Sequence, residues 1–272
     1  MRAGIGVVYF TLTPIEVTKM TKRRTILKTV LAAPVMSIVN AGSAQTVRNV
    51  SKPINKGSDI QVGVNEVDHF MWAAVDLELA SAEFERLTGV HPAFGGRHMG
   101  FGTHNALVSL SNGSYMEVLA LDPEQDTGGP LGAEIALLTS PEILAFHIKR
   151  ADLESVVSVY QEMNIAYTGP FDLSRQRPDG EVLRWRLLLA ESPVYKHALP
   201  VFIDWMDAPH PSKSAPAGCE LIHFEVGYPY NEELSSLYEK LDVTVPVVYS
   251  REPYAKATLD TPKGKVVLHG RL

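Results

Sequence analysis

The chain has 272 residues, of which 45% are hydrophobic and 21% are charged, and its formal net charge at pH 7 is −6. A single cysteine, Cys219, excludes an internal disulfide and a cysteine-based zinc site. Residues 1–44 hold six basic residues and one acidic residue, which leaves 19 basic against 30 acidic residues in the rest. That acidic remainder is poorly suited to nucleic acid or to a membrane surface, and we expect neither as a partner.

The N-terminal segment has the features of an export signal. Arg23 and Arg24 precede an apolar stretch of about eleven residues, too short for a membrane span, which needs roughly 20. Small residues follow and end at Ala44, where a signal peptidase could cut. We therefore predict a twin-arginine signal peptide over residues 1–44, with Met20 as an alternative start, and a periplasmic or secreted mature protein.

After a polar linker at residues 45–63, one order of elements occurs three times: a short apolar strand, a helix, and three further strands. The predicted strands and helices of the three copies are 67–74, 79–87, 96–101, 106–110 and 115–121; 143–148, 152–163, near 168, 182–189 and 200–205; and 221–226, 231–241, 245–250, 255–259 and 265–269. This repetition predicts an α+β fold of β-α-β-β-β modules that form cupped mixed sheets. Modules one and two occupy residues 64–207, a Pro-rich joint 208–217, and module three 218–272.

Paired β-α-β-β-β units resemble the vicinal-oxygen-chelate superfamily, which includes glyoxalase I and the extradiol dioxygenases. The first module resembles the glyoxalase-like domain family of that superfamily, and the resemblance covers nearly all of residues 65–270. The motifs that carry it include Asp68-His69, Gly102-Thr103-His104-Asn105 and Tyr115-Met116-Glu117-Val118. The resemblance implies a metal-dependent lyase, isomerase or dioxygenase that acts on a small carbonyl or vicinal-oxygen substrate. The alternative is a protein of the same fold that binds or sequesters a small molecule without chemistry.

Glu117 is the strongest candidate for a catalytic residue. It lies in an otherwise apolar strand, where a carboxylate is costly to bury unpaired. Either Glu117 faces solvent, or it meets a cation or a donor inside a cavity. The superfamily places metal ligands on the first and fourth strands of paired modules, so the resemblance pairs Glu117 with His69, as metal ligands or as acid and base.

The third metal ligand depends on which modules face each other. If modules one and three share the site, His223 completes a set of two histidines and one carboxylate, which suits Zn²⁺, Fe²⁺ or Mn²⁺. If modules one and two share it, Asp204 takes that place, with His147 as a further candidate. We favour His223 because the resulting ligand types are the more conventional.

The glycine-rich segment 97–105 can bend closely over a cavity. Its polar side chains are candidates to orient an anionic or carbonyl substrate, namely Arg97, His98, His104 and Asn105. The alternative is a twisted hairpin without a binding role. Arg184 and Arg186 alternate with apolar residues, which is typical of a solvated strand face, with a carboxylate clamp as the alternative. The sequence indicates neither the substrate nor the oligomeric state, and a homodimer is one option.

Overall fold

The structure, a computed structural model, describes residues 64–126, 129–176 and 180–272. The predicted signal peptide and linker lie outside these residues. None of the helices in the described part of the chain has the length and apolar character needed to cross a membrane.

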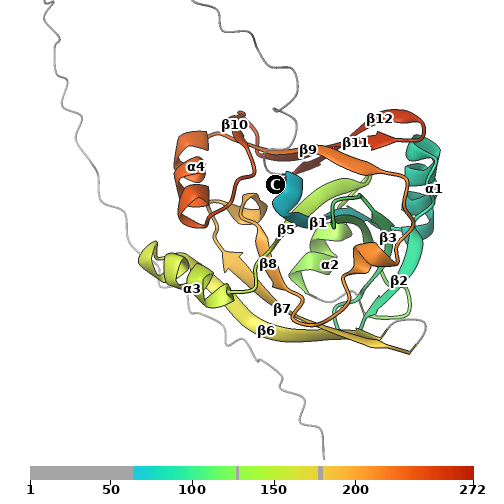
Figure 1. Ribbon diagram of the computed structural model, residues 1–272, viewed down its shortest axis with the longest axis horizontal. Helices are drawn as coiled ribbons and strands as arrows, with labels where there is room; N and C mark the ends of the chain where they lie inside the picture. Colours follow the sequence, from blue (N-terminus) through green and yellow to red (C-terminus); the bar gives the residue numbers. More distant parts are fainter. Residues whose placement is uncertain (1–63, 127–128, 177–179) are drawn as a thin grey trace, which may run out of the picture. The chain divides into compact units, whose positions relative to one another are not determined.

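The described residues follow the predicted element order (Figure 1). The first module consists of β1 (Val67–Ala74), α1 (Leu77–Thr88), β2 (Ala93–His98), β3 (Thr103–Ser109) and β4 (Tyr115–Leu121). After α2 (Pro130–Ile135), the second consists of β5 (Glu142–Lys149), α3 (Leu153–Glu162), β6 (Ala166–Gln176), β7 (Val182–Glu191) and β8 (Val201–Asp204). The third consists of β9 (Glu220–Tyr228), α4 (Asn231–Lys240), β10 (Val247–Tyr249), β11 (Tyr254–Thr261) and β12 (Gly264–Arg271).

Modules one and two join into one eight-stranded sheet with the order β2-β3-β4-β1-β5-β8-β7-β6. In each module the first strand is parallel to the fourth, and the two first strands pair antiparallel at the centre. There Phe70 lies opposite Phe146, and one β-bulge on each strand, at Asp68 and at Leu144, lies two residues before that phenylalanine. The modules are therefore related by a pseudo-twofold axis at the Phe70–Phe146 pair. This arrangement confirms the α+β fold class with cupped mixed sheets.

The third module repeats the element order but has a different strand order. Its sheet runs β10-β9-β11-β12, so its first strand lies between the second and the third. In modules one and two the first strand lies next to the fourth instead. The third copy is therefore not a topological copy of the other two, and positions matched to it by counting along the chain do not occupy equivalent places.

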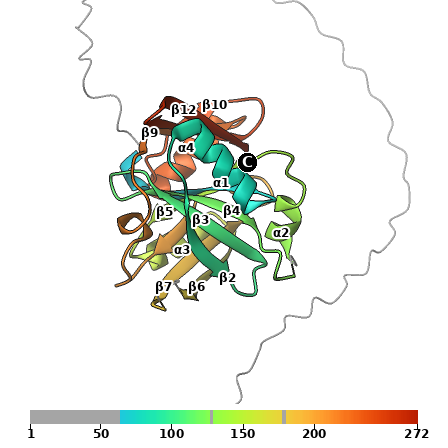
Figure 2. The same ribbon diagram turned by 90° about the vertical axis from the view of Figure 1, so that its right-hand side faces the viewer.

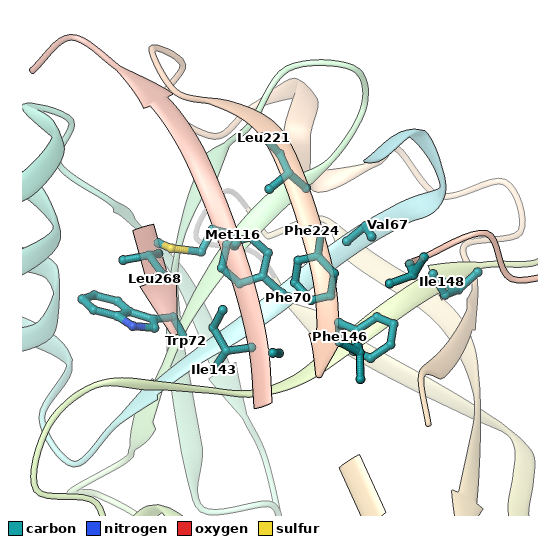
Figure 3. Close-up of a cluster of buried hydrophobic side chains, with 14 of the residues drawn as sticks. Val67, Phe70, Trp72, Met116, Ile143, Phe146, Ile148, Leu221, Phe224 and Leu268 are labelled. Carbon is teal, nitrogen blue, oxygen red and sulfur yellow. The ribbon is translucent and has the colours of Figure 1, made fainter. Parts of the chain in front are cut away.

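The four-stranded sheet packs on the convex side of the large sheet, where modules one and two meet. Figure 3 shows Phe224 of β9 against Phe70 and Phe146 in a shared apolar cluster. Each of the three rings is fully buried, and burial of a side chain of this size stabilises the fold by about 1.5–3 kcal/mol. At Gly270 of β12 a Cβ would lie 1.8 Å from the carbonyl oxygen of Ile143, so only glycine allows this close approach to β5.

The eight-stranded sheet curls until its two edges lie side by side. Figures 1 and 2 both show edge strand β6 next to edge strand β2. Arg175 of β6 donates from Nη1 to Oδ1 of Asn105 on β3, 2.8 Å away, across this gap. After the bulges at Asp68 and Leu144, even-numbered residues of β1 and β5, such as Phe70 and Phe146, point outward into the main core, so their odd-numbered neighbours point into the curl.

Candidate functional site

The curled sheet encloses a cavity of about 230 Å³. Alternate residues of nearly every strand of this sheet point into it. Its polar lining residues are His69, His98, Thr103, Asn105, Tyr115, Glu117, His147, Ser174 and Arg175. Its apolar lining residues are Met71, Met99, Phe101, Leu107, Leu119, Leu131, Phe171, Leu173, Trp185, Leu187, Leu189, Val201, Ile203 and Trp205.

Asp68 and His69 form a buried pair on β1. Asp68 is the extra residue of the β1 bulge, which lets its carboxylate lie beside the imidazole of its neighbour. Asp68 Oδ1 lies 2.6 Å from Nδ1 of His69. Asp68 Oδ2 accepts a hydrogen bond from Nε1 of Trp205 at 3.0 Å and lies 3.0 Å from Nε2 of His210. The carboxylate is therefore surrounded by donors.

These donors determine the charge of Asp68 and the tautomer of His69. Burial alone would raise the pKa of the Asp68 carboxyl, but the hydrogen bonds from His210 and His69 outweigh it and hold that pKa well below its usual range. An ionised Asp68 accepts the Nδ1 proton of His69, so the Nε2 lone pair of His69 is left for the cavity.

Glu117 on β4 lies beside that lone pair. Its neighbours Met116 and Val118 point into the main core, while Glu117 points into the cavity with 6% of its surface exposed. Its Oε1 accepts a hydrogen bond from Nδ2 of Asn105 at 2.5 Å. Its Oε2 lies 3.8 Å from Nε2 of His69, and Oε1 lies 3.7 Å from Nε2 of His98. The carboxylate is thus buried between two imidazoles.

The imidazoles of His98 and His147 are neutral near pH 7. Burial lowers the pKa of His98, which the negative charge of Glu117 only partly offsets. Burial and the nearby His69 lower the pKa of His147 well below its usual range. The ring of His69 stacks on that of His147 with centroids 3.8 Å apart and planes 13° apart. Since these two planes are nearly parallel, the ring nitrogens of His69 and His147 cannot point at one shared ion.

The structure brings five of the predicted site residues together in the cavity: His69, Glu117, His98, Asn105 and His147. It places Arg97 and His104 elsewhere, because they are cross-strand neighbours on the opposite face of the β2–β3 hairpin. Arg97 pairs there with Asp122 and with Glu124, and His104 lies edge-on to Phe94. A direct role in binding a substrate inside the cavity is therefore not open to Arg97 or His104.

Neither His223 nor Asp204 joins His69 and Glu117, and the third candidate, His147, lies in the cavity but stacks on His69. His223 lies in the four-stranded sheet, with its Nε2 2.7 Å from Glu225, because the third module packs on the convex side. Asp204 is absent from the cavity lining and pairs with Arg186 at 2.6 Å, whereas its neighbours Ile203 and Trp205 line the cavity.

The donors present do not match the superfamily pattern of ligands from two paired modules. Counting from the pseudo-twofold pair, the module-two counterpart of His69 is Ala145 and that of Glu117 is Val201. Superfamily members typically bind divalent metals. Within the described residues, however, no group of three or more His, Cys, Asp or Glu side chains is arranged to hold a metal ion.

Three site residues escaped the sequence reasoning: Asp68, His210 and Arg175. Asp68, like Glu117, is a carboxylate in an otherwise apolar strand. Only the bulge in the structure shows that Asp68 lies beside His69. Arg175 and His210 reach the site through sheet closure and the Pro-rich joint, and neither feature leaves a pattern in the sequence.

The family model described as "Glyoxalase-like domain" matches residues 67–241, more than half of the chain. The chain therefore belongs to the glyoxalase-like domain family, and the resemblance to the vicinal-oxygen-chelate superfamily is confirmed. The match ends at the end of α4, so it covers modules one and two completely and module three only in part. No curated protein matches this chain significantly.

Among solved structures, one shares the fold of this chain and others are less similar. A hypothetical protein from Staphylococcus aureus is 16% identical with a TM-score of 0.53, covering 75% of this chain and 85% of its own. A methylmalonyl-CoA epimerase from Mycobacterium tuberculosis is 16% identical with a TM-score of 0.38, covering 57% and 95%. A variant of the Streptomyces coelicolor enzyme of that name, in complex with 2-nitronate-propionyl-CoA, is 15% identical with a TM-score of 0.37, covering 53% and 98%.

Proposed function

We propose that this protein is an enzyme that moves a proton on a small carbonyl compound bound inside the eight-stranded sheet. The observation that carries the proposal is the arrangement of three buried groups. Glu117 Oε2 lies 3.8 Å from Nε2 of His69, and Nδ1 of His69 is held by Asp68 at 2.6 Å. A carboxylate and an oriented imidazole that share one enclosed space are the usual partners in general acid–base catalysis.

In the proposed reaction a substrate C–H next to a carbonyl lies against Glu117. The C–H bond breaks, an O–H bond forms on Glu117, and the electron pair moves to the carbonyl oxygen to give an enolate. Asn105 holds the carboxylate in place through its Nδ2 donor. Nε2 of His69 accepts the proton in turn, and the imidazolium that results is stabilised by Asp68. Return of the proton to the original or the neighbouring carbon completes an exchange or an isomerisation.

Hydrogen–deuterium exchange tests this function directly. Hydroxyacetone and phenylpyruvate are incubated with the protein in D₂O, and loss of their α-proton signals is followed by NMR. We expect exchange above background with wild-type protein, loss of it in Glu117→Gln, and retention in His104→Gln, which changes the outer face of the same hairpin. Equal exchange in wild type and Glu117→Gln would contradict the proposal. Binding of a probe without exchange would favour a non-catalytic binding protein.

A metal-dependent enzyme is the second candidate. It is favoured by the position of Glu117, whose two oxygens lie 3.8 Å and 3.7 Å from the Nε2 atoms of His69 and His98. Zn²⁺, Fe²⁺ or Mn²⁺ would be its cofactor. Metal content is measured on protein purified without chelator, for wild type and for a His69→Ala/Glu117→Ala variant. Stoichiometric metal that only the wild type retains would support this candidate, and equal, negligible metal in both would exclude it.

Export by the twin-arginine pathway is a separate proposal, supported by Arg23 and Arg24 ahead of the short apolar stretch. The full chain is produced in a bacterium with an intact pathway, and cell fractions are compared. We expect shortened protein in the periplasm, and retention in the cytoplasm when both arginines are changed to lysine. Unchanged export of the double-lysine variant would contradict the pathway.

A further inference from the structure

Arg175 is a buried cation in the cavity wall. Only 8% of its surface is exposed, although it belongs to an edge strand. Its Nη1 donates to the neutral amide of Asn105. A buried guanidinium without a negatively charged partner is costly. In a cavity wall, that partner can come from a bound molecule.

Strand β2 is shaped to let this side chain reach the cavity. At Gly95 a Cβ would lie 3.1 Å from Nη1 of Arg175, and at Gly96 it would lie 2.9 Å from Cδ of Arg175. Gly96 also has a φ of +145°, which side-chain-bearing residues rarely adopt. Two consecutive glycines thus leave room for one arginine.

A purely structural clamp between the two sheet edges is the competing explanation for Arg175. The half-buried arginines of this fold show what such clamps look like: Arg97 pairs with Asp122, Arg150 with Asp242, and Arg186 with Asp204. No carboxylate among the described residues pairs with Arg175, whose partner there is the neutral amide of Asn105. A clamp onto a neutral amide leaves this buried positive charge without a negatively charged partner, which the three other arginines have.

We infer that Arg175 binds the carboxylate of the substrate, so that the substrate is a small carbonyl-containing carboxylic acid. Arg175 is joined to Glu117 through one side chain: its Nη1 lies 2.8 Å from Oδ1 of Asn105, whose Nδ2 lies 2.5 Å from Glu117. A carboxylate bound to Arg175 inside the cavity therefore places its adjoining carbons near Glu117. Where the reacting carbon lies rests on the proposed function, whereas the anion subsite does not.

The remaining walls define the body of that acid. Leu173, Trp185 and Leu187 line the β6–β7 side of the cavity. They offer apolar surface and no charge, so an aliphatic or aromatic body is favoured over a second charged group. Arg184 and Arg186 cannot bind the carboxylate of a substrate in the cavity, because the residues of β7 that face the cavity are the odd-numbered ones.

Phenylacetate and phenylacetamide test the anion subsite, because they share a shape and differ in charge. Their affinities for the purified protein are measured by calorimetry. We expect wild type to bind phenylacetate at least about tenfold more tightly, as a charge-assisted hydrogen bond allows. Arg175→Gln should bring the two affinities within about twofold, and Arg175→Lys should retain part of the preference. Arg184→Gln, an exposed arginine of the same hairpin, should retain all of it.

Equal affinities in wild type, including failure of both probes to bind, would overturn the inference, as would an unchanged preference in Arg175→Gln. Thermal melting of each variant shows whether it is folded. Glu117→Gln separates this inference from the proposed function. That variant should lose exchange activity yet bind phenylacetate more tightly, since a nearby like charge is removed. If wild-type protein prefers the carboxylate but shows no exchange, the proposed proton-transfer activity is wrong and the inferred carboxylate-binding subsite is supported.

Discussion

The two halves of the eight-stranded sheet share a backbone plan and differ in what they point inward. Both have the strand order first-fourth-third-second, both begin their first strand with a bulge, and both begin their helix at a capping aspartate, Asp76 or Asp152. The chemical groups of module one are Asp68, His69 and Glu117, and their counterparts in module two are Leu144, Ala145 and Val201.

This difference shows at which positions the fold requires apolar residues. The outward residues of both modules are apolar because they fill the shared core, as Phe70 and Phe146 do at the pseudo-twofold axis. The inward residues do not have to fill that core, so one half holds Glu117 and the Asp68–His69 pair, and the other a mostly apolar wall with His147, Ser174 and Arg175. Sheet duplication thus provides an enclosed space, and the division of polarity gives that space the side proposed to react with the substrate and the side proposed to bind it.

The largest expected effect comes from removing the carboxylate of module one. Glu117→Gln should lower exchange activity by about 10²- to 10⁴-fold, because a positioned acid–base group contributes on that scale. Val201→Ala, at the mirrored position, should change activity only a few-fold. Initial exchange rates by NMR check both variants. A loss of equal size in the two would mean that the cavity's shape, and not the carboxylate, determines the rate.

Asp68→Asn should have the next largest effect, about ten- to a hundredfold on kcat with little change in KM. The amide keeps the size of the side chain but loses the charge that holds the Nδ1 proton of His69 and stabilises its imidazolium. The mirrored variant Leu144→Ala should instead cost about 2–5 kcal/mol of unfolding free energy, as a buried leucine does. An effect of Asp68→Asn on KM alone would assign Asp68 to substrate binding.

The neutral imidazoles make stability dependent on pH. His98 and His147 have lowered pKa values in the folded state, so between those values and about 6.5 the unfolded chain binds more protons than the folded one. Unfolding free energy should therefore fall as pH drops below about 6.5, by up to about 1.4 kcal/mol per pH unit for each histidine. His147→Met, which copies the mirrored Met71, should make the slope shallower in denaturant titrations. An unchanged slope would show that His147 does not titrate in this range.

Local sequence patterns predicted the elements and half of the site. Apolar alternation and capping aspartates are local features, and they were sufficient to locate the strands and helices of the three modules, but α2 between modules one and two was not predicted. Glu117 and His69 were found because a charge in an apolar strand and a family motif mark them directly. The third module shows the limit: its element order repeats, but its first strand pairs with the second and third, a choice made by packing.

The rest of the site depends on relations between distant segments. His223 was matched to His69 by position along the chain, which fails once the strand order differs. Asp204 points away from the cavity because successive residues of a strand face opposite sides, so an error of one residue in the alignment reverses the predicted side. Arg175 becomes a site residue only when β6 closes against β2, and no spacing in the sequence records that closure.

The smallest expected effect concerns Arg97, which the structure places outside the cavity. Burial alone would raise the pKa of its partner Asp122, but hydrogen bonds from Gln125, the Glu124 backbone and Arg97 lower it to about 2. This carboxylate therefore stabilises the fold above about pH 3.8, and its contribution is lost as pH falls toward 2. Arg97→Gln should leave exchange activity unchanged and shift unfolding free energy at pH 7 by less than about 1 kcal/mol, as for other partly exposed pairs. A rise in KM for phenylpyruvate in Arg97→Gln, with Asp122→Asn unaffected, would mean that the outer face of β2 also contacts the substrate and that the reacting side of the cup extends beyond its cavity.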